Sequence, residues 1–129
     1  MSGIRTPLAR VRGLGSAKAG VEHWWMQRLT ALALVPLTLW FVFSVVALTG
    51  ADHGTVGLWL ARPRNAVLMI LLVVAAFHHA QLGLQVVIED YVHGEAARLA
   101  ATVAVKLLAL LLAAGSIFGI MRIAFGVFG

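Results

Sequence analysis

Three long apolar runs, separated by short polar stretches, organise this chain. The runs cover about residues 29–49, 65–89 and 99–122, and the first of them contains no charged residue. At roughly 1.5 Å per residue, a helix of about 20 apolar residues crosses a hydrocarbon core of about 30 Å. Because backbone polar groups in lipid must be paired within the protein, each run is expected to be helical. The pattern therefore predicts an all-α integral membrane protein with three transmembrane helices.

Polar segments surround these runs and define the rest of the chain. They are an N-terminal arm at 1–28, a turn-rich connection at 50–64, a short turn at 90–98 and a tail at 123–129. The arm is basic, and the apolar run after it starts late and is too long for a signal peptide. The arm is therefore expected to be retained.

The distribution of Lys and Arg predicts the orientation in the membrane. Five of them precede the first run, at Arg5, Arg10, Arg12, Lys18 and Arg28, whereas the first connection contains Arg62 and Arg64. Cytoplasmic segments have an excess of these residues, so the N-terminus is expected in the cytoplasm. Three crossings then leave the C-terminus on the periplasmic side.

Composition narrows the possible function classes. Hydrophobic residues make up 61% of the chain and charged residues 12%, and the mean hydropathy is +0.95. The residues behind the net charge of +5 form no basic patch with interleaved aromatics, so no nucleic-acid partner is expected. The chain contains no cysteine, which excludes disulfides, thiolate metal sites and cysteine nucleophiles.

Polar residues inside the second run need an explanation, because an ionisable group at a helix centre in lipid costs about 2.5–3.5 kcal/mol. At 100° per residue, His79 shares one helical stripe with Gly83, Val86 and Asp90. Gly83 leaves a recess one turn from His79, where a planar group or another helix can approach the backbone. His79 is about 16 Å from Asp90 along the axis, near the bilayer midplane.

Two interpretations of His79 stay open on this pattern alone. A neutral imidazole can ligate a metal or haem iron, and it can equally be a buried hydrogen-bonding or proton-relay group. His78 points about 100° away from His79 and is expected to pack or hydrogen-bond with another helix. Asp90 and Tyr91 alone are typical of a helix end with an interfacial tyrosine.

The residues from His79 to Val92 read HAQLGLQVVIEDYV. They resemble the H-A-x-x-G-x(6)-D-Y-V signature of the hydrophobic membrane-anchor subunit of succinate dehydrogenase, respiratory complex II. The stretch Gly20–Ala31, GVEHWWMQRLTA, resembles the segment that leads into the first helix of that family. The likeness covers about Gly20 to Ile120.

The resemblance implies a haem site that two chains share. His79 would be one axial ligand of a b-type haem, the second histidine coming from a companion cytochrome b-type anchor subunit, and Gly83 would face the haem. Arg28 would pair with a haem propionate, as guanidinium groups suit carboxylates. His23 lies one position away from the family histidine near this arginine, which puts its own propionate role in question.

The resemblance also implies a quinone site. Tyr91 would donate a hydrogen bond to a ubiquinone carbonyl, with Asp90 beside it, near the iron–sulfur subunit. Electrons from succinate would arrive through the flavoprotein and iron–sulfur subunits, so this chain would contribute no catalytic residue of its own. The expected location is a bacterial inner membrane, or the mitochondrial inner membrane, with lipid as a further partner.

Two alternatives stay open beside this interpretation. One is a non-enzymatic membrane scaffold or assembly subunit, in which the histidines and glutamines join helices. Another is the anchor of a menaquinone-linked fumarate reductase. Lys106, inside the third run, is expected to snorkel to the cytoplasmic surface or to pair with a haem propionate or an acidic lipid.

Overall fold

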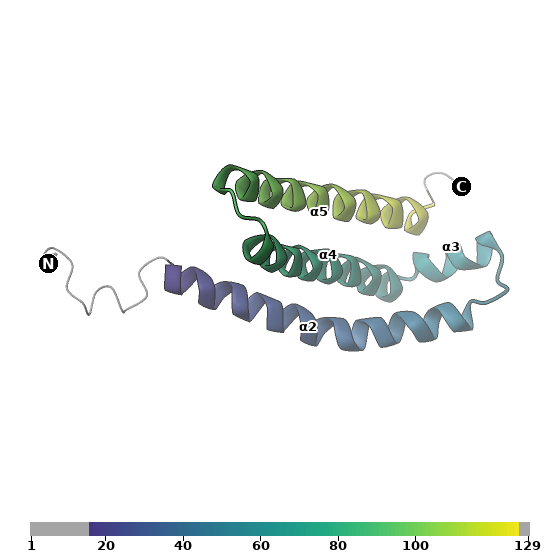
Figure 1. Ribbon diagram of the computed structural model, residues 1–129. Coiled ribbons are helices and arrows are strands. Elements are labelled where there is room, and N and C mark those ends of the chain that lie inside the picture. Colours follow the sequence, from purple (N-terminus) through teal and green to yellow (C-terminus); the bar gives the residue numbers. More distant parts are fainter. Residues whose placement is uncertain (1–15, 127–129) are drawn as a thin grey trace, which may run out of the picture.

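The computed structural model describes residues 16–126, with side chains from residue 20 onward. The described part of the chain forms four helices and no strand: α2 (Ser16–Ala47), α3 (His53–Ala61), α4 (Pro63–Tyr91) and α5 (Glu95–Ala124) (Figure 1). Within it, α2 from Gly20, α4 and α5 are each long and apolar enough to cross a membrane. The predicted all-α class with three transmembrane helices is confirmed.

The helix boundaries differ from those that the apolar runs suggested. The helix expected from residue 29 begins at Ser16, inside the segment assigned to the arm. A charge-free run marks the part of a helix that crosses lipid, whereas the helix itself continues into the polar boundary. Residues 1–15 of the arm and 127–129 of the tail lie outside the described residues. α2 runs unbroken through Pro36 and curves along its length (Figure 1).

The connection expected to be a turn-rich segment contains the short helix α3. Asp52 is its N-cap, and the carboxylate accepts a hydrogen bond of 2.8 Å from the backbone N–H of Thr55. The Thr55 side chain, and then its backbone N–H, lower the pKa of Asp52 below its ordinary value. The cap is thus present above the unfolded-state pKa and is lost as the pH falls through the folded-state pKa.

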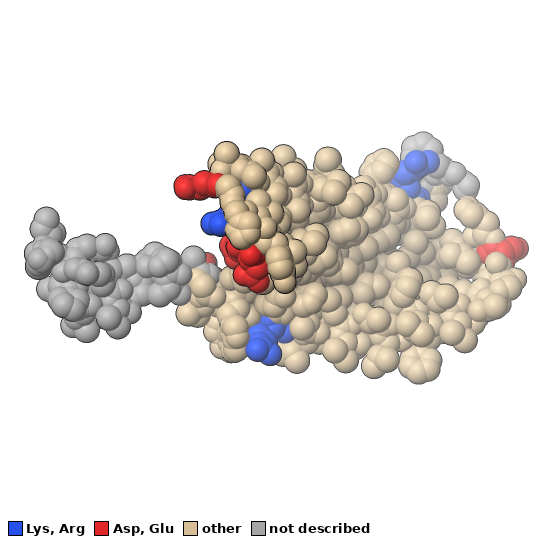
Figure 2. Space-filling view, in the orientation of Figure 1, with Lys and Arg blue, Asp and Glu red and all other residues tan. Residues whose placement is uncertain are grey.

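α4 is the central helix of the bundle. It packs against both α2 and α5, and no contact joins α2 to α5 in the described chain (Figure 1). Such an open layer buries little, and its buried apolar side chains are Leu60, Leu82, Ile88 and Ile120. On the face in Figure 2, charged side chains gather near the two ends and the middle is uncharged. This is the surface expected of a protein solvated by lipid and by partner helices.

The corner between α3 and α4 depends on Asn65, whose side chain is 1% exposed. Its Nδ2 donates a 2.8 Å hydrogen bond to the backbone oxygen of Trp59, while its Oδ1 has no partner in the described structure. The Trp59 ring stacks on Trp40 of α2, with centroids 5.6 Å apart. Asn65 and Trp59 together therefore fix how α3 returns the chain from α2 to α4.

Replacing Asn65 with Asp keeps the shape of the side chain and turns the donor into an oxygen that faces the Trp59 carbonyl. We expect a loss of about 2 kcal/mol in unfolding free energy, because a buried hydrogen bond is lost and a polar group is left unpaired. Denaturation of the purified protein in detergent measures the loss. Thr49→Val is the control, since the side chain of exposed Thr49, in the turn after α2, bonds only to the backbone oxygen of Val45. Equal stability of N65D and T49V would contradict this role.

Candidate functional site

A hydrogen bond between Thr30 on α2 and His79 on α4 lies at the centre of the candidate site. Oγ1 of Thr30 is 3.0 Å from Nδ1 of His79, and Thr30 is 7% exposed. The same hydroxyl donates its hydrogen to the backbone oxygen of Met26, 2.7 Å away, and the backbone oxygen of Gln27 lies 3.1 Å from it as a second acceptor. A hydroxyl has a single hydrogen, and here the α2 backbone accepts it. Thr30 therefore accepts a hydrogen bond from Nδ1–H of His79, the tautomer that this geometry favours.

This tautomer leaves the lone pair of His79 on Nε2. No described residue makes a hydrogen bond to that nitrogen. An imidazole whose Nδ1–H is bonded to an oxygen and whose Nε2 has a lone pair is in the state that metal-ligating histidines adopt. The chemistry open to His79 is thus ligation or hydrogen-bond acceptance through Nε2.

Two other polar side chains on the α2 face that contains Thr30 have atoms without partners in the described chain. His23, Gln27 and Thr30 follow one another at helical spacing and share one stripe of α2. Nε2 of His23 and Oε1 of Gln27 are buried and unpaired in the described chain. A buried polar atom without a partner costs about 1–3 kcal/mol. Such orphaned atoms indicate that the groove faces a further polar group in the assembled protein.

Gly83 gives the groove its open side. α2 and α4 are antiparallel, so residues after His79 on α4 lie beside residues before Thr30 on α2 (Figure 1). A Cβ added at Gly83 would meet no atom within 4 Å. The space beside the Gly83 backbone is therefore open in the described chain.

Arg28 lies close to His79 along the axis of the helix bundle. It directly precedes the first apolar run, lies inside α2, and comes two residues before Thr30, which bonds to His79. Two residues correspond to a rise of about 3 Å. The exposed guanidinium lies 5.1 Å from the centroid of the Trp24 ring.

Asp90 and Tyr91 end α4, on the same membrane side as the start of α2. Both residues are exposed, Tyr91 by 75%. Neither side chain makes a hydrogen bond to another described residue. The structure thus brings Thr30, His79 and Gly83 together in the groove and leaves the Asp90–Tyr91 pair about three turns away, on the exposed edge.

His78 lies in a different groove from His79, as its angle on the helix predicted. It lines a hollow of about 550 Å³ between α4 and α5, together with Gln81 and Lys106. Nε2 of His78 is buried and has no partner in residues 20–126. The third helix begins at Glu95, so Lys106 is about three turns from its first residue.

Two features of the site were missed in the sequence. One is Thr30, although its spacing from Gln27 and His23 is helical. The other is a ladder along α4, in which Gln81 donates to Gln85 at 3.2 Å and Gln85 donates to Glu89 at 3.4 Å. The i, i+4 spacing of these three residues was the available signal.

The described residues around His79 supply no complete set of metal ligands. Among the described residues, no group of three or more His, Asp or Glu side chains is arranged to hold a metal ion. A metal or haem iron bound to His79 would need its remaining ligands from a cofactor or from another chain.

Comparison with known proteins identifies the family. Residues 2–113 match the family model described as succinate dehydrogenase/fumarate reductase transmembrane subunit. The succinate dehydrogenase hydrophobic membrane anchor subunit of Rickettsia bellii (strain RML369-C) is 37% identical over 108 residues, covering 84% of this chain and 86% of that protein.

Other relatives have the same description. The succinate dehydrogenase membrane anchor subunit of Reclinomonas americana is 34% identical over 96 residues, 72% of this chain and 80% of its own length. The hydrophobic membrane anchor subunit of Paracoccus denitrificans is 33% identical over 89 residues, 69% of each chain. No solved structure gives a significant match.

The three apolar helices and these relatives together make the chain a multi-pass membrane protein, and a bacterial inner membrane fits the Rickettsia relatives. Its role is that of a subunit within an oxidoreductase complex. The chain belongs to the family of succinate dehydrogenase and fumarate reductase transmembrane subunits, and within it to the hydrophobic membrane anchors of succinate dehydrogenase.

Proposed function

We propose that this anchor subunit co-ligates a b-type haem through Nε2 of His79, with the second axial histidine supplied by a companion anchor subunit. The observation behind the proposal is the hydrogen bond from Nδ1–H of His79 to Thr30, which directs the Nε2 lone pair outward. The fit is supported by the open recess at Gly83, which gives a planar group room against the backbone. A bound haem would supply a one-electron carrier inside the membrane.

Arg28 is the residue we assign to a haem propionate. Its depth, about 3 Å from that of Thr30, and its exposed guanidinium suit a carboxylate next to the groove. His23 is a second candidate, because its buried Nε2 lacks a partner in the described chain. It lies more than one helical turn before Arg28, on the stripe of α2 that contains Thr30. Both side chains would compensate the charge of the propionates.

The quinone site is proposed at the exposed end of α4. Reduction of ubiquinone to the quinol takes up two electrons and two protons, so the carbonyl oxygens gain negative charge as electrons arrive. The Tyr91 hydroxyl is exposed and unengaged within the described residues, and it can donate a hydrogen bond to such an oxygen. Asp90 beside it would adjust the charge of the site and accept or release a proton.

The proposed orientation places this end in the cytoplasm, where the iron–sulfur and flavoprotein subunits would dock. Six Lys or Arg residues belong to the membrane end that contains the N-terminus, and three belong to the opposite end. The six are Arg5, Arg10, Arg12, Lys18, Arg28 and Arg98, and the three are Arg62, Arg64 and Arg122. This difference agrees with the positive-inside rule. The relatives are described as succinate dehydrogenase anchors, which favours succinate oxidation over a menaquinone-linked fumarate reductase.

His79→Ala tests the ligand assignment, with His78→Ala as a matched control from the other groove. We expect complexes containing H79A to lose the b-type reduced-minus-oxidised spectrum, because metal affinity falls steeply when a ligand is removed. H78A should keep the spectrum of the parent protein. An unchanged spectrum in H79A would favour the scaffold alternative.

Thr30→Val removes the acceptor for Nδ1–H of His79 while keeping the volume of the side chain. Haem retention should fall about tenfold, as is common when a ligand loses its outer hydrogen bond, and the haem midpoint potential should rise because a less basic ligand stabilises ferric iron less. Redox titration in the visible range measures the shift. Thr30→Ser should restore both properties, and Thr38→Val, at an exposed position of α2, should leave them unchanged.

Tyr91→Phe separates quinone chemistry from succinate oxidation. We expect about a tenfold loss of succinate–quinone activity, the value of one hydrogen bond to a charged oxygen. Succinate oxidation with an artificial electron acceptor should be unchanged, because it bypasses the membrane site. Equal losses in the two assays would exclude a quinone role for Tyr91.

A further inference from the structure

A cation lies deep inside the last transmembrane helix. Lys106 follows the first residue of α5, Glu95, by eleven residues, which is a rise of about 16 Å. Arg98, the next charged residue toward that end of α5, is eight residues away, about 12 Å. A lysine stem extends about 6 Å, so the ammonium does not reach the level of Arg98. Lys106 therefore places a charge where the surrounding solvent is hydrocarbon.

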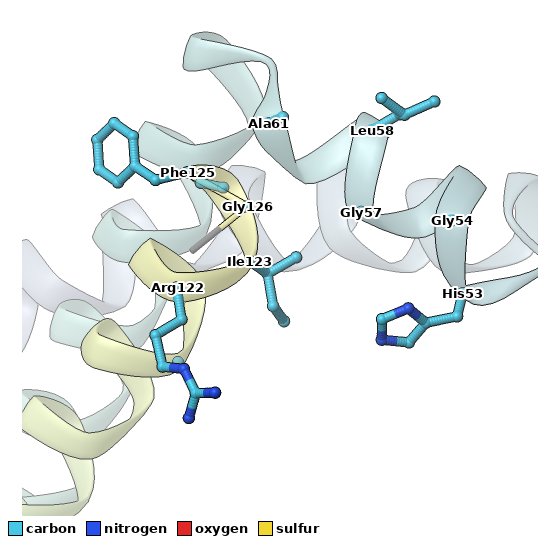
Figure 3. Close-up of a pocket in the computed structure, with 11 residues that line it drawn as sticks. His53, Gly54, Gly57, Leu58, Ala61, Arg122, Ile123, Phe125 and Gly126 are labelled. Carbon is cyan, nitrogen blue, oxygen red and sulfur yellow. The ribbon is translucent and has the colours of Figure 1, made fainter. Parts of the chain in front are cut away.

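The other two cations of α5 are placed differently. Arg98 donates from its guanidinium to the backbone oxygen of Val92 at 3.3 Å. Arg122 lies in the last turn of the helix, where it borders a hollow between α3 and α5 (Figure 3). Its guanidinium lies 5.9 Å from the centroid of the Phe118 ring, so it too is engaged within the chain. Both arginines thus have partners and are close to a helix end.

No described residue makes a hydrogen bond or an ion pair with Lys106, whose side chain is exposed. A carboxylate could neutralise the ammonium, but every acidic residue of the chain is a cap or lies within about two turns of a helix end. These residues are Glu22, Asp52, Glu89, Asp90 and Glu95. Charged side chains inside membrane helices are rare and pair with other polar groups. The counter-charge of Lys106 must therefore come from outside the chain.

Two more polar side chains face the hollow of about 550 Å³ that Lys106 lines between α4 and α5. Nε2 of His78 is buried and has no partner in the described chain. Gln81 is 9% exposed and donates to Gln85, while its own side-chain oxygen accepts from no described residue. The rest of the lining is apolar, and apolar cavities stay dry. Water therefore does not satisfy these groups.

Small residues form much of the α5 wall of this hollow. Ala109 and Ala113 are one helical turn apart, and Ala114 follows them in the lining. Small side chains at this spacing let the backbone of another transmembrane helix come close. Leu110, in the same lining, is 66% exposed, so the hollow is accessible from the outside of the bundle. The surface formed by His78, Gln81, Lys106, Ala109 and Ala113 is called the α4–α5 groove below.

Three other occupants would leave the ammonium without a counter-charge. A phospholipid has its anionic group at the membrane surface, beyond the reach of Lys106. A haem propionate would lie in the groove between α2 and α4, on the other flank of α4. A second copy of this chain has no carboxylate at this depth and would bring another lysine. Only a segment that holds a carboxylate inside the membrane fits the charge.

We propose that the α4–α5 groove binds a transmembrane helix of another subunit of the complex, and that an Asp or Glu side chain of this helix pairs with Lys106. The ammonium donates hydrogen bonds to the carboxylate. Polar groups of the same helix engage Nε2 of His78 and the side-chain oxygen of Gln81. The pairing does not depend on the haem or quinone assignments, because the proposed sites for both lie outside the α4–α5 groove.

Photo-crosslinking in membranes that contain the complete complex identifies the occupant. A photoreactive phenylalanine analogue at Ala109, inside the groove, should link to a transmembrane segment of another subunit. Mass spectrometry of the linked peptides should locate an Asp or Glu within about one turn, 5 Å, of the linked residue. The analogue at Leu111, which is 69% exposed and outside the groove, should not give this link.

Variants at Lys106 test the charge pairing in the purified complex. Lys106→Glu should raise the apparent dissociation constant of the complex about tenfold, the scale of one interhelical polar contact in a membrane. Dilution in detergent, followed by native mass spectrometry of the intact complex, measures it. Lys106→Gln should act in the same direction if K106E does not insert. Lys106→Arg keeps the charge, and Arg64→Gln removes an exposed cation at the other end, so both should assemble like the parent protein.

A charge swap decides between a pairing and a general defect. Replacing the cross-linked Asp or Glu with Lys should restore assembly to K106E. The proposal is overturned if K106E and K106Q assemble like the parent protein, or if the swap restores nothing. It is also overturned if the analogue at position 109 links only to lipid, to a second copy of this chain, or to a segment without a carboxylate.

Discussion

The hydrogen bond between Thr30 and His79 joins α2 to α4 at a depth where lipid offers no polar partner. The Thr30 hydroxyl is satisfied by its own helix and still accepts from the imidazole, so both groups are paired without water. On the other flank of α4, His78 and Gln81 face α5. Polar side chains on two flanks of one helix each require a neighbour, and this requirement places α4 between the other two.

The number and class of helices were predictable because hydrophobic runs record the thickness of the bilayer. Helix ends were less predictable, since α2 continues from the first apolar run through Arg28 and Lys18 to Ser16, the first described residue. α3 was hidden by Gly54 and Gly57, which are poor helix formers, although Asp52 and Thr55 form a capping pair at its start.

The site was predictable only as far as one helix determines it. The stripe of His79 and Gly83 follows from helical periodicity, and the recess at Gly83 is present. Thr30 was not found because its role depends on the register between α2 and α4, 49 residues apart in sequence, and a single sequence contains no measure of that register.

The open layer has a consequence for how a large planar molecule reaches the groove. α2 and α5 make no contact with each other in the described chain. The described helices therefore form no closed ring around His79. Entry can proceed sideways, in the plane of the bilayer, and needs no helix to unfold or separate. In the proposed haem site, a companion subunit would close this exposed side of His79.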